Sequence, residues 1–251
     1  MSIDEALLSS FDPINSLPSF RVYSWSPPAL SIGRFQNPSK EIDLERCNRD
    51  NLTFIRRITG GGALYHADEL TYSIVCSIEQ IPETVSVKDS FRVLTGFLLD
   101  FYHALGLNAA YAVDAVSNKG QLGGRTSFCY AGKETFDILV DGRKMGGNAQ
   151  RRLKNIVFQH GSIPIKDCTT SGLQYMVDRS TGYAEDSASL IGCGIDSDVD
   201  SLKQALIESF GRRMNAAMQR CRLTHEEDMS SKKLLTEKYS AERWNLRGEI
   251  T

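Results

Sequence analysis

Three clusters of residues have types and spacings that could support chemistry on a bound ligand. The first is Arg56-Arg57-Ile58-Thr59-Gly60-Gly61-Gly62, which follows a predicted strand and leads to His66. Three glycines let the backbone approach a ligand closely, and the two arginines before them could meet an anion. The cluster has neither the ending of a Walker A motif nor the spacing of a dinucleotide-binding fingerprint. A glycine-rich turn between two strands, capped by His66, is an equally good interpretation.

The second cluster places a lysine beside two glycines. Lys144 follows the turn formed by Asp141-Gly142 and precedes Gly146-Gly147, and the segment Gln159-His160-Gly161-Ser162 comes shortly after it. An ammonium held beside a glycine-opened strand can stabilise negative charge on a carbonyl oxygen or a thiolate. The ordinary alternative is a solvated lysine on a hairpin, because most lysines are exposed.

The third cluster contains Cys129, which lies between glycines and close in sequence to Arg125. A free thiol has a pKa of about 8.5 and is only slightly ionised at neutral pH. A cation within about 4–6 Å would lower that pKa by 1–3 units and make the sulfur a nucleophile. A structural or incidental role is nevertheless the commoner fate of a lone cysteine, so none of the three clusters decides the function by itself.

The segments that must position these clusters are strands and helices in irregular order. Residues 70–78 alternate apolar and polar side chains, which predicts a half-buried strand. The Asp141-Gly142 pair predicts a type I′ hairpin between residues 136–140 and the strand from Arg143. Further strands are predicted at 20–25, 54–58 and 157–165. Hairpins without regular strand–helix alternation favour an α+β fold with a mixed, largely antiparallel sheet flanked by helices.

Apolar side chains at helical spacing predict two long helices, at 88–105, followed by Gly106, and at 202–218. A short helix is predicted at the N-terminus, with Ser2 and Glu5 as its capping box. We expect residues 1–251 to form a single catalytic domain, with the motifs in a core of about 15–220. A polar helical tail is predicted after that core.

Composition excludes several classes of protein. The chain has 251 residues, of which 41% are hydrophobic and 24% charged, as in ordinary globular proteins. Its 29 basic and 31 acidic residues lack the basic surplus of a nucleic-acid-binding protein. Six scattered cysteines and four histidines show no metal-ligand spacing, so no metal site is predicted. No apolar run reaches the roughly 20 residues of a membrane span, and the acidic N-terminus is unlike a signal peptide. We expect a cytoplasmic protein without a membrane partner.

Taken together, the clusters resemble the signatures of the biotin/lipoate protein ligase superfamily. The first cluster continues into Asp68-Glu69-Leu70-Thr71-Tyr72-Ser73, and this string resembles the first signature. The string Gly142-Arg143-Lys144-Met145-Gly146-Gly147-Asn148-Ala149-Gln150, with Gln159-His160-Gly161-Ser162-Ile163, resembles the second, including its lysine. The string Trp25-Ser26-Pro27-Pro28-Ala29-Leu30-Ser31-Ile32-Gly33-Arg34-Phe35-Gln36 resembles the superfamily's N-terminal part. The resemblance is dense over about residues 2–165 and loose in the tail. It implies the α+β catalytic domain of biotin and lipoate ligases.

Within that superfamily the chain is most similar to the cysteine-dependent, ligase-like octanoyltransferases. In that group a cysteine precedes the lysine of the second signature at a fixed distance, and Cys129 stands at the matching place, 15 residues before Lys144. Such enzymes carry the acyl group as a thioester and need no nucleotide, because exchange between thioesters is nearly isoenergetic and amide formation then runs downhill. A cysteine is superfluous for adenylation but necessary for a thioester relay.

The resemblance implies Cys129 as the nucleophile and Lys144 as the group that lowers its pKa and steadies the oxyanion. The residues predicted to bind substrate surround them in the two signatures: Arg57, Gly60, Gly61, Gly62, His66, Tyr72, Ser73, Gly146, Gly147, Asn148, Ala149 and His160. His160 is the weakest of these and is expected to support the pocket by hydrogen bonding. The implied donor is acyl carrier protein. The implied acceptor is a lipoyl domain or the glycine cleavage H protein, and no cofactor is expected.

Alternatives remain open at this point. Gly62 and Asn148 stand where the transferases usually have arginine and serine, and both are typical of ligases. In an ATP-dependent lipoate ligase, which would use ATP and Mg²⁺, Lys144 would contact the adenylate and Cys129 would be incidental. A non-catalytic module that binds carrier proteins is a third possibility. Biotin ligation fits less well, because the motifs favour the lipoyl side.

Overall fold

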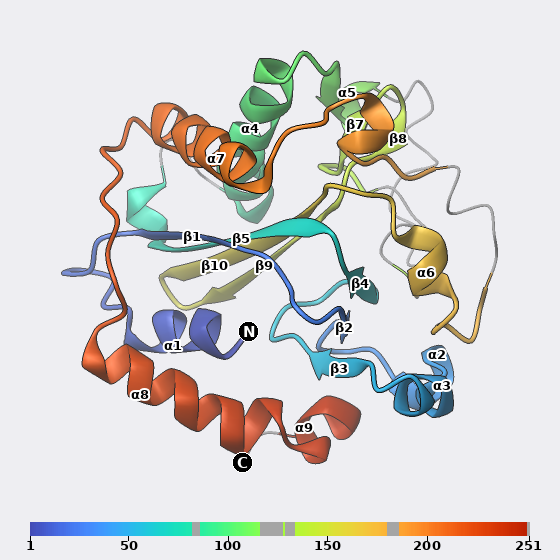
Figure 1. Cartoon of the computed structure of the whole chain (residues 1–251). Helices are drawn as coiled ribbons and strands as arrows, with labels where there is room; N and C mark the ends of the chain where they lie inside the picture. The colour runs from blue at the N-terminus through green and yellow to red at the C-terminus, as the bar shows by residue number, and fades with distance from the viewer. Residues whose placement is uncertain (82–85, 116–127, 129–133, 180–185, 250–251) are drawn as a thin grey trace.

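The computed structural model describes residues 1–81, 86–115, 128, 134–179 and 186–249 (Figure 1). Its strands are β1 (Ser19–Tyr23), β2 (Ala29–Ile32), β3 (Thr53–Arg56), β4 (Leu64–His66), β5 (Glu69–Ser77), β6 (Ala109–Tyr111), β7 (Ile138–Val140), β8 (Arg143–Lys144), β9 (Gly147–Leu153) and β10 (Ile156–Pro164). Its helices are α1 (Ser2–Ser10), α2 (Pro38–Glu41), α3 (Leu44–Arg49), α4 (Val87–Ala104), α5 (Ala112–Ala115), α6 (Thr169–Leu173), α7 (Val199–Arg213), α8 (His225–Leu234) and α9 (Glu242–Arg247).

The strands form three sheets. The largest is antiparallel with the order β1-β5-β10-β9. A second sheet has the order β3-β2-β4, in which β2 runs parallel to β3 and antiparallel to β4. The third, β6-β7-β8, is antiparallel. The predicted α+β fold with a mixed, largely antiparallel sheet is therefore confirmed.

Helices cover both faces of the four-stranded sheet. Figure 1 shows α4 and α7 on one side of it and α1 with α8 on the other. Tyr72 and Ile74 of β5 pack with Phe97 of α4 and Phe210 of α7 in the first core. Val75 and Phe158, on the opposite face, pack with residues of α1 and of the C-terminal segment in a separate core. The parts of the two signatures that lie on β5, β9 and β10 are thus on strands enclosed from two sides.

This double cover overturns the prediction of a half-buried strand at 70–78. All nine residues of β5 are buried. Glu69, Thr71 and Ser73 are not exposed to water but bonded inside the protein, as when the Ser73 Oγ donates to Asp4 Oδ1 over 2.8 Å. Alternation along a strand marks a face that is polar, and here a second layer of helices covers that face.

Most of the local predictions are confirmed. The hairpin β7–β8 turns at Asp141 and Gly142, whose φ angles of 49° and 79° are those that a type I′ turn requires. Helix α4 ends before Gly106, which has a φ of 80°. Helix α7 ends at Arg213 and so falls short of the predicted limit at 218.

One prediction about the chain ends is wrong. Helix α1 begins at Ser2 and has no side-chain cap, so the proposed capping box does not form. Its Glu5 instead accepts hydrogen bonds from Lys238 Nζ and Tyr239 Oη. The C-terminal tail, residues 225–249, is helical as predicted, and it packs onto the rest of the protein through Tyr239 and Trp244, which are buried in the core that contains Val75 and Phe158. Among the helices that the structure describes, none combines the length and apolar character needed to cross a membrane.

Candidate active site

Lys144 is buried and paired with a carboxylate. Its Nζ lies 2.7 Å from Asp137 Oδ2, and the two residues are 3% and 6% exposed. Strand β8 is fixed beside residues 186–188, because the Lys144 N–H donates to the Asp186 carbonyl and the Ala188 N–H donates to the Lys144 carbonyl. The solvated-lysine interpretation is therefore wrong.

The two signatures on either side of Lys144 meet through a close approach of backbones. Gly146 has a φ of 76°, and a Cβ at this position would collide with the Ser162 carbonyl oxygen. The chain then enters β9, where Gly147 pairs with Ser162. This register also places Ala149 opposite His160, so the sequence-separated strings form adjoining strands.

Tyr72, Asn148 and Gly161 form one group on the sheet face covered by α4. Tyr72 Oη donates to Asn148 Oδ1 over 2.7 Å and accepts from Gln159 Nε2 over 3.3 Å. Burial raises the pKa of Tyr72, so its hydroxyl stays protonated and remains a donor. A Cβ on Gly161 would collide with Asn148 and Tyr72, which explains the glycine there.

Ser73 and His160 form a second group on the opposite face. His160 Nε2 lies 2.7 Å from Thr59 Oγ1. Burial, reinforced by the charge of Arg57, lowers the pKa of His160 to about 3, so the imidazole is neutral at physiological pH. Burial would raise the pKa of Asp4, the partner of Ser73, but the N-terminal ammonium and Arg21 outweigh it and lower that pKa to about 2.

The predicted substrate-binding set is therefore divided by the sheet. Tyr72 and Ser73 are neighbours in sequence, and successive side chains of a strand point to opposite faces. They pair with Gly161 and His160 of β10, and each pair lies on its own face. One ligand slot can be lined directly by one of the two groups, while the other supports it from behind.

A buried polar chain connects Arg57, His66 and the start of β5. Arg57 Nη1 donates to Ser31 Oγ over 2.7 Å, and the same oxygen lies 2.6 Å from His66 Nε2. The other ring nitrogen of His66 lies 2.7 Å from Glu69 Oε1. Ser162 Oγ donates to the second oxygen of Glu69, so the chain ends at β10. His66 is consequently part of an interior network and not merely the cap of a turn.

Arg57 also orders the glycine loop, residues 59–63. Its Nη2 donates to the carbonyl oxygens of Gly60 and Gly62, at 3.2 and 2.8 Å. Gly61 has a φ of 97°, and a Cβ on Gly33 would collide with the Gly61 carbonyl oxygen. The two strict glycine requirements here are thus at Gly61 and Gly33, whereas the Cα of Gly60 faces open space.

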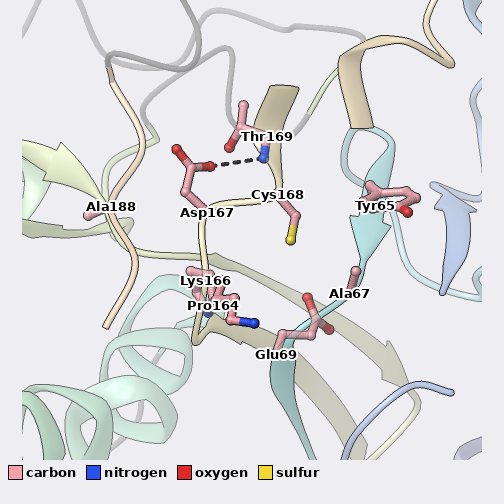
Figure 2. Close-up of a pocket in the computed structure, with 9 residues that line it drawn as sticks. All are labelled: Tyr65, Ala67, Glu69, Pro164, Lys166, Asp167, Cys168, Thr169 and Ala188. Atoms are coloured by element: carbon pink, nitrogen blue, oxygen red, sulfur yellow. Dashed lines mark hydrogen bonds between the residues drawn. The ribbon is translucent and has the colours of Figure 1, made fainter. Parts of the chain in front are cut away.

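A small pocket lies where β10 leads into α6 (Figure 2). Its lining residues come from β4 to β5, from the end of β10 to the start of α6, and from the segment beside β8: Tyr65, Ala67, Glu69, Pro164, Lys166, Asp167, Cys168, Thr169 and Ala188. Figure 2 shows the Cys168 sulfur directed into it. Burial, and then the charges of Asp68 and Asp167, raise the pKa of this thiol, which makes it a poor nucleophile. Sequence reasoning did not select Cys168, since a lone cysteine gives no signal of its own.

Cys129, the predicted nucleophile, lies outside the described residues. Phe128, which precedes it in sequence, is 2% exposed and pairs with Ala63, directly after the three glycines. In the described part of the chain, no group of three or more histidine, cysteine or acidic residues is arranged to hold a metal ion.

Comparison with known proteins gives the class of this site. The family profile described as "Lipoyl protein ligase A/B catalytic domain" matches residues 1–220, and the chain therefore belongs to that family. Octanoyltransferase LipM of Anoxybacillus flavithermus is 34% identical, across 98% of this chain and 93% of that protein. Octanoyltransferase LipM of Bacillus subtilis is 32% identical with the same coverage. The protein is an acyltransferase.

Solved structures confirm the fold. Lipoate-protein ligase A bound with ATP superimposes with a TM-score of 0.81 at 24% identity, covering 98% of this chain and 92% of that one. A putative lipoate protein ligase from T. acidophilum, solved with bound lipoic acid, superimposes with a TM-score of 0.80 at 26% identity. The match covers 99% of this chain and 93% of that one. The arrangement of the three sheets and their helices is thus the one found in lipoate ligases.

Proposed function

We propose that this enzyme transfers an octanoyl group from acyl carrier protein to a lysine of a lipoyl-accepting protein, in lipoate biosynthesis. The observation that carries the proposal is the match, along 98% of the chain, to relatives named octanoyltransferases. The acceptor would be a lipoyl domain, such as that of the glycine cleavage H protein. No nucleotide or metal takes part in the proposed reaction.

The proposed reaction has two acyl transfers. In the first, the Cys129 thiolate attacks the carbonyl of the octanoyl thioester, and the donor leaves as a thiol after taking up a proton. In the second, the acceptor lysine attacks the enzyme thioester, forms an amide and regenerates the thiol. The first transfer is close to isoenergetic and the second is downhill, so neither requires ATP hydrolysis to drive it.

The described residues support this proposal at two points. Lys144 is held in the interior by Asp137. A group that stabilises an oxyanion must be held in this way at a fixed position away from solvent. Phe128, the residue before Cys129, pairs with Ala63 at the end of the glycine loop, which belongs to the first signature. This pairing links the first and third clusters, and the β5–β10–β9 register links the first and second, which favours a site built from all three.

Intact-mass measurement tests the proposal. Enzyme mixed with octanoyl-acyl carrier protein and no nucleotide should gain the mass of one octanoyl group. Cys129→Ser should gain none and should fail to modify the acceptor. Cys168→Ala is the matched control, because Cys168 lines the pocket but has a raised pKa, and it should acylate normally.

Three results would count against this mechanism. Acceptor modification by Cys129→Ser at the full rate would exclude the thioester relay. Modification from free octanoate only in the presence of ATP would indicate a ligase. Loss of the adduct in Cys168→Ala, with Cys129 intact, would move the nucleophile to the pocket of Figure 2.

A further inference from the structure

A rigid turn next to the glycine loop displays an aromatic side chain to solvent. The turn comprises residues 33–36 and is here called the anchor turn. It is closed by a hydrogen bond from the Gln36 N–H to the Gly33 carbonyl over 3.2 Å, and Gln36 Oε1 accepts from the Gly33 N–H over 2.9 Å. The Arg34 N–H donates to the Thr59 carbonyl over 2.7 Å. The anchor turn is therefore bonded to the first residue of the glycine loop.

Arg56 fixes the anchor turn from beneath. Its Nη1 donates to the carbonyl oxygens of Gly33, Arg34 and Gln36, at 3.3, 2.8 and 2.9 Å. Its Nε and Nη2 donate to carbonyl oxygens of the C-terminal tail. Arg56 is 2% exposed, so these bonds are shielded from water. The turn cannot rearrange to hide its side chains without breaking several of them.

The side chain that this scaffold displays is Phe35, which is 86% exposed. An exposed phenylalanine loses the favourable free energy that burial of its ring would give. Aromatic residues and arginine are the types that dominate binding energy at protein interfaces. A phenylalanine held out on a preformed turn loses little further freedom when a partner covers it, which favours binding.

Positive charge lies on one side of this aromatic side chain. The Arg34 guanidinium carbon lies 5.9 Å from the Phe35 ring centre and 5.8 Å from that of Trp244. Arg34 Nη1 is buried and has no hydrogen-bond partner among the described residues. Arg151 reaches the same loop, since its Nη1 donates to the carbonyl of Ile58, the residue before Thr59, over 3.1 Å. On the other side of the turn, Glu41 is engaged by Gln36 Nε2 and the Asn37 N–H.

We propose that Phe35 and Arg34 form the docking anchor for the acyl donor, an acidic carrier protein whose phosphopantetheine arm bears the thioester. The inference rests on the proposed function and names the surface at which that donor binds. Charge favours the donor over the acceptor, because the donor arm contains a phosphodiester that suits a guanidinium, whereas the acceptor presents an ammonium. Because the Arg34 N–H bonds to Thr59 of the glycine loop, a carrier bound at the anchor turn would have its arm next to the predicted substrate-binding loop.

Comparison of a large and a small acyl donor distinguishes an effect on carrier docking from an effect on catalysis. For Phe35→Ser, kcat/KM with octanoyl-acyl carrier protein should fall about tenfold or more, as for an interface hot spot. With a small thioester, octanoyl-N-acetylcysteamine, kcat/KM should stay within about twofold of the wild type, since a molecule that small cannot reach the anchor. Leu17→Ser is the matched control, because Leu17 is also 86% exposed but lies near Gln80, at the far end of β5. It should leave both substrates unaffected.

Binding of the carrier protein can be measured without turnover. Octanoyl-acyl carrier protein is titrated into Cys129→Ala with and without Phe35→Ser, and the second change should weaken binding about tenfold. Arg34→Gln should weaken it as well and reduce its dependence on salt. Equal losses with both substrates, unchanged carrier binding, or an effect confined to the acceptor would each overturn the inference. Failure of the wild type to acylate at all would instead count against the proposed function.

Discussion

Lys144 Nζ lies 2.7 Å from Asp137 Oδ2, and both side chains are removed from water. Asp137 stands at the start of the strand that pairs with β8, and its carboxylate is itself held by the N–H of Glu134. The pair explains how a lysine can reside inside the protein, because a buried ammonium without a counter-charge would be strongly unfavourable. It also fixes the ammonium at one position, whatever group it faces.

Removal of Asp137 should therefore be costly. Asp137→Asn leaves the Lys144 ammonium buried beside a neutral amide, and breaking a buried pair in this way costs about 3–5 kcal/mol of unfolding free energy. Urea denaturation at pH 7 measures the loss. Asp200→Asn is the matched control, because Asp200 also pairs with a lysine but is exposed, and it should have no measurable effect. Similar midpoints for all three proteins would show that the Lys144–Asp137 pair does not form.

The glycine loop offers a test within a single tripeptide. Gly61→Ala forces a side chain into a φ of 97° beside Arg57 Nη2, and we expect a loss of about 1–3 kcal/mol in stability. Gly60→Ala meets no atom within 4 Å and has no unusual φ, so its stability should stay near that of the wild type. Urea denaturation and acyl transfer are compared for both variants.

Activity of Gly60→Ala then tests the predicted contact with substrate. Loss of acyl transfer in a variant with normal stability would support the prediction that Gly60 approaches the ligand. Full activity would remove Gly60 from the substrate-binding set. Equal destabilisation by the two substitutions would contradict the loop geometry itself.

His160 should make stability fall as the pH decreases. Its pKa is about 3 in the folded protein and 6.5 in the unfolded chain, so between these values only the unfolded chain binds the proton. The unfolding free energy therefore decreases by about 1.4 kcal/mol for each pH unit below 6.5, or about 2 kcal/mol by pH 5. The part of this window between pH 5 and 6.5 lies above the range in which Asp4 titrates.

Denaturation of His160→Gln at pH 7 and pH 5 isolates this contribution. The other three histidines are present in both proteins, so their effects cancel in the comparison. The variant should lose about 2 kcal/mol less than the wild type on going from pH 7 to pH 5. A parallel decline in the two proteins would mean that His160 binds its proton in the folded state as readily as in the unfolded chain.

Local sequence patterns predicted the elements well but not their surroundings. The Asp141-Gly142 pair and the spacing of apolar residues in α4 are signals within one segment, and both were confirmed. The burial of the second face of β5 depends on α1 and on the C-terminal tail, which are distant in sequence, and period-two alternation cannot report them. The partner of Lys144 was missed for a different reason: Asp137 lies within the predicted hairpin, but a turn signal does not report which side chains meet across the two strands. Asp137 is an ordinary acidic residue until the hairpin folds back and brings it to the lysine.

The candidate site shows a similar division. The signatures identified which strings belong together, and the sheet register brings them onto adjoining strands. They did not reveal that the Tyr72 and Ser73 side chains lie on opposite faces of the sheet. They also did not reveal that Arg57 Nη2 donates to the carbonyl oxygens of the glycine loop. These are consequences of the pleat and of packing, and a motif written as a string of letters contains neither.

The last prediction concerns Glu5, which fastens the C-terminal tail to α1. Its carboxylate accepts from Lys238 Nζ over 2.7 Å and from Tyr239 Oη over 2.7 Å, and Lys238 Nζ lies 3.9 Å from the Trp244 ring centre. Glu5→Gln removes the charge that balances Lys238, and we expect a loss of about 1.5–3 kcal/mol, as for a hydrogen bond to a charged group.

Limited trypsin digestion of Glu5→Gln locates that loss. If the tail detaches, Lys238 becomes accessible, and cleavage after it should be faster than in the wild type. Glu237→Gln is the control, because Glu237 lies in the same helical turn but is exposed, and its cleavage should be unchanged. Since Arg56 bonds both the tail and the anchor turn, acyl transfer from the carrier protein should weaken together with faster cleavage. Faster cleavage with full activity would show that the tail and the anchor turn are not coupled.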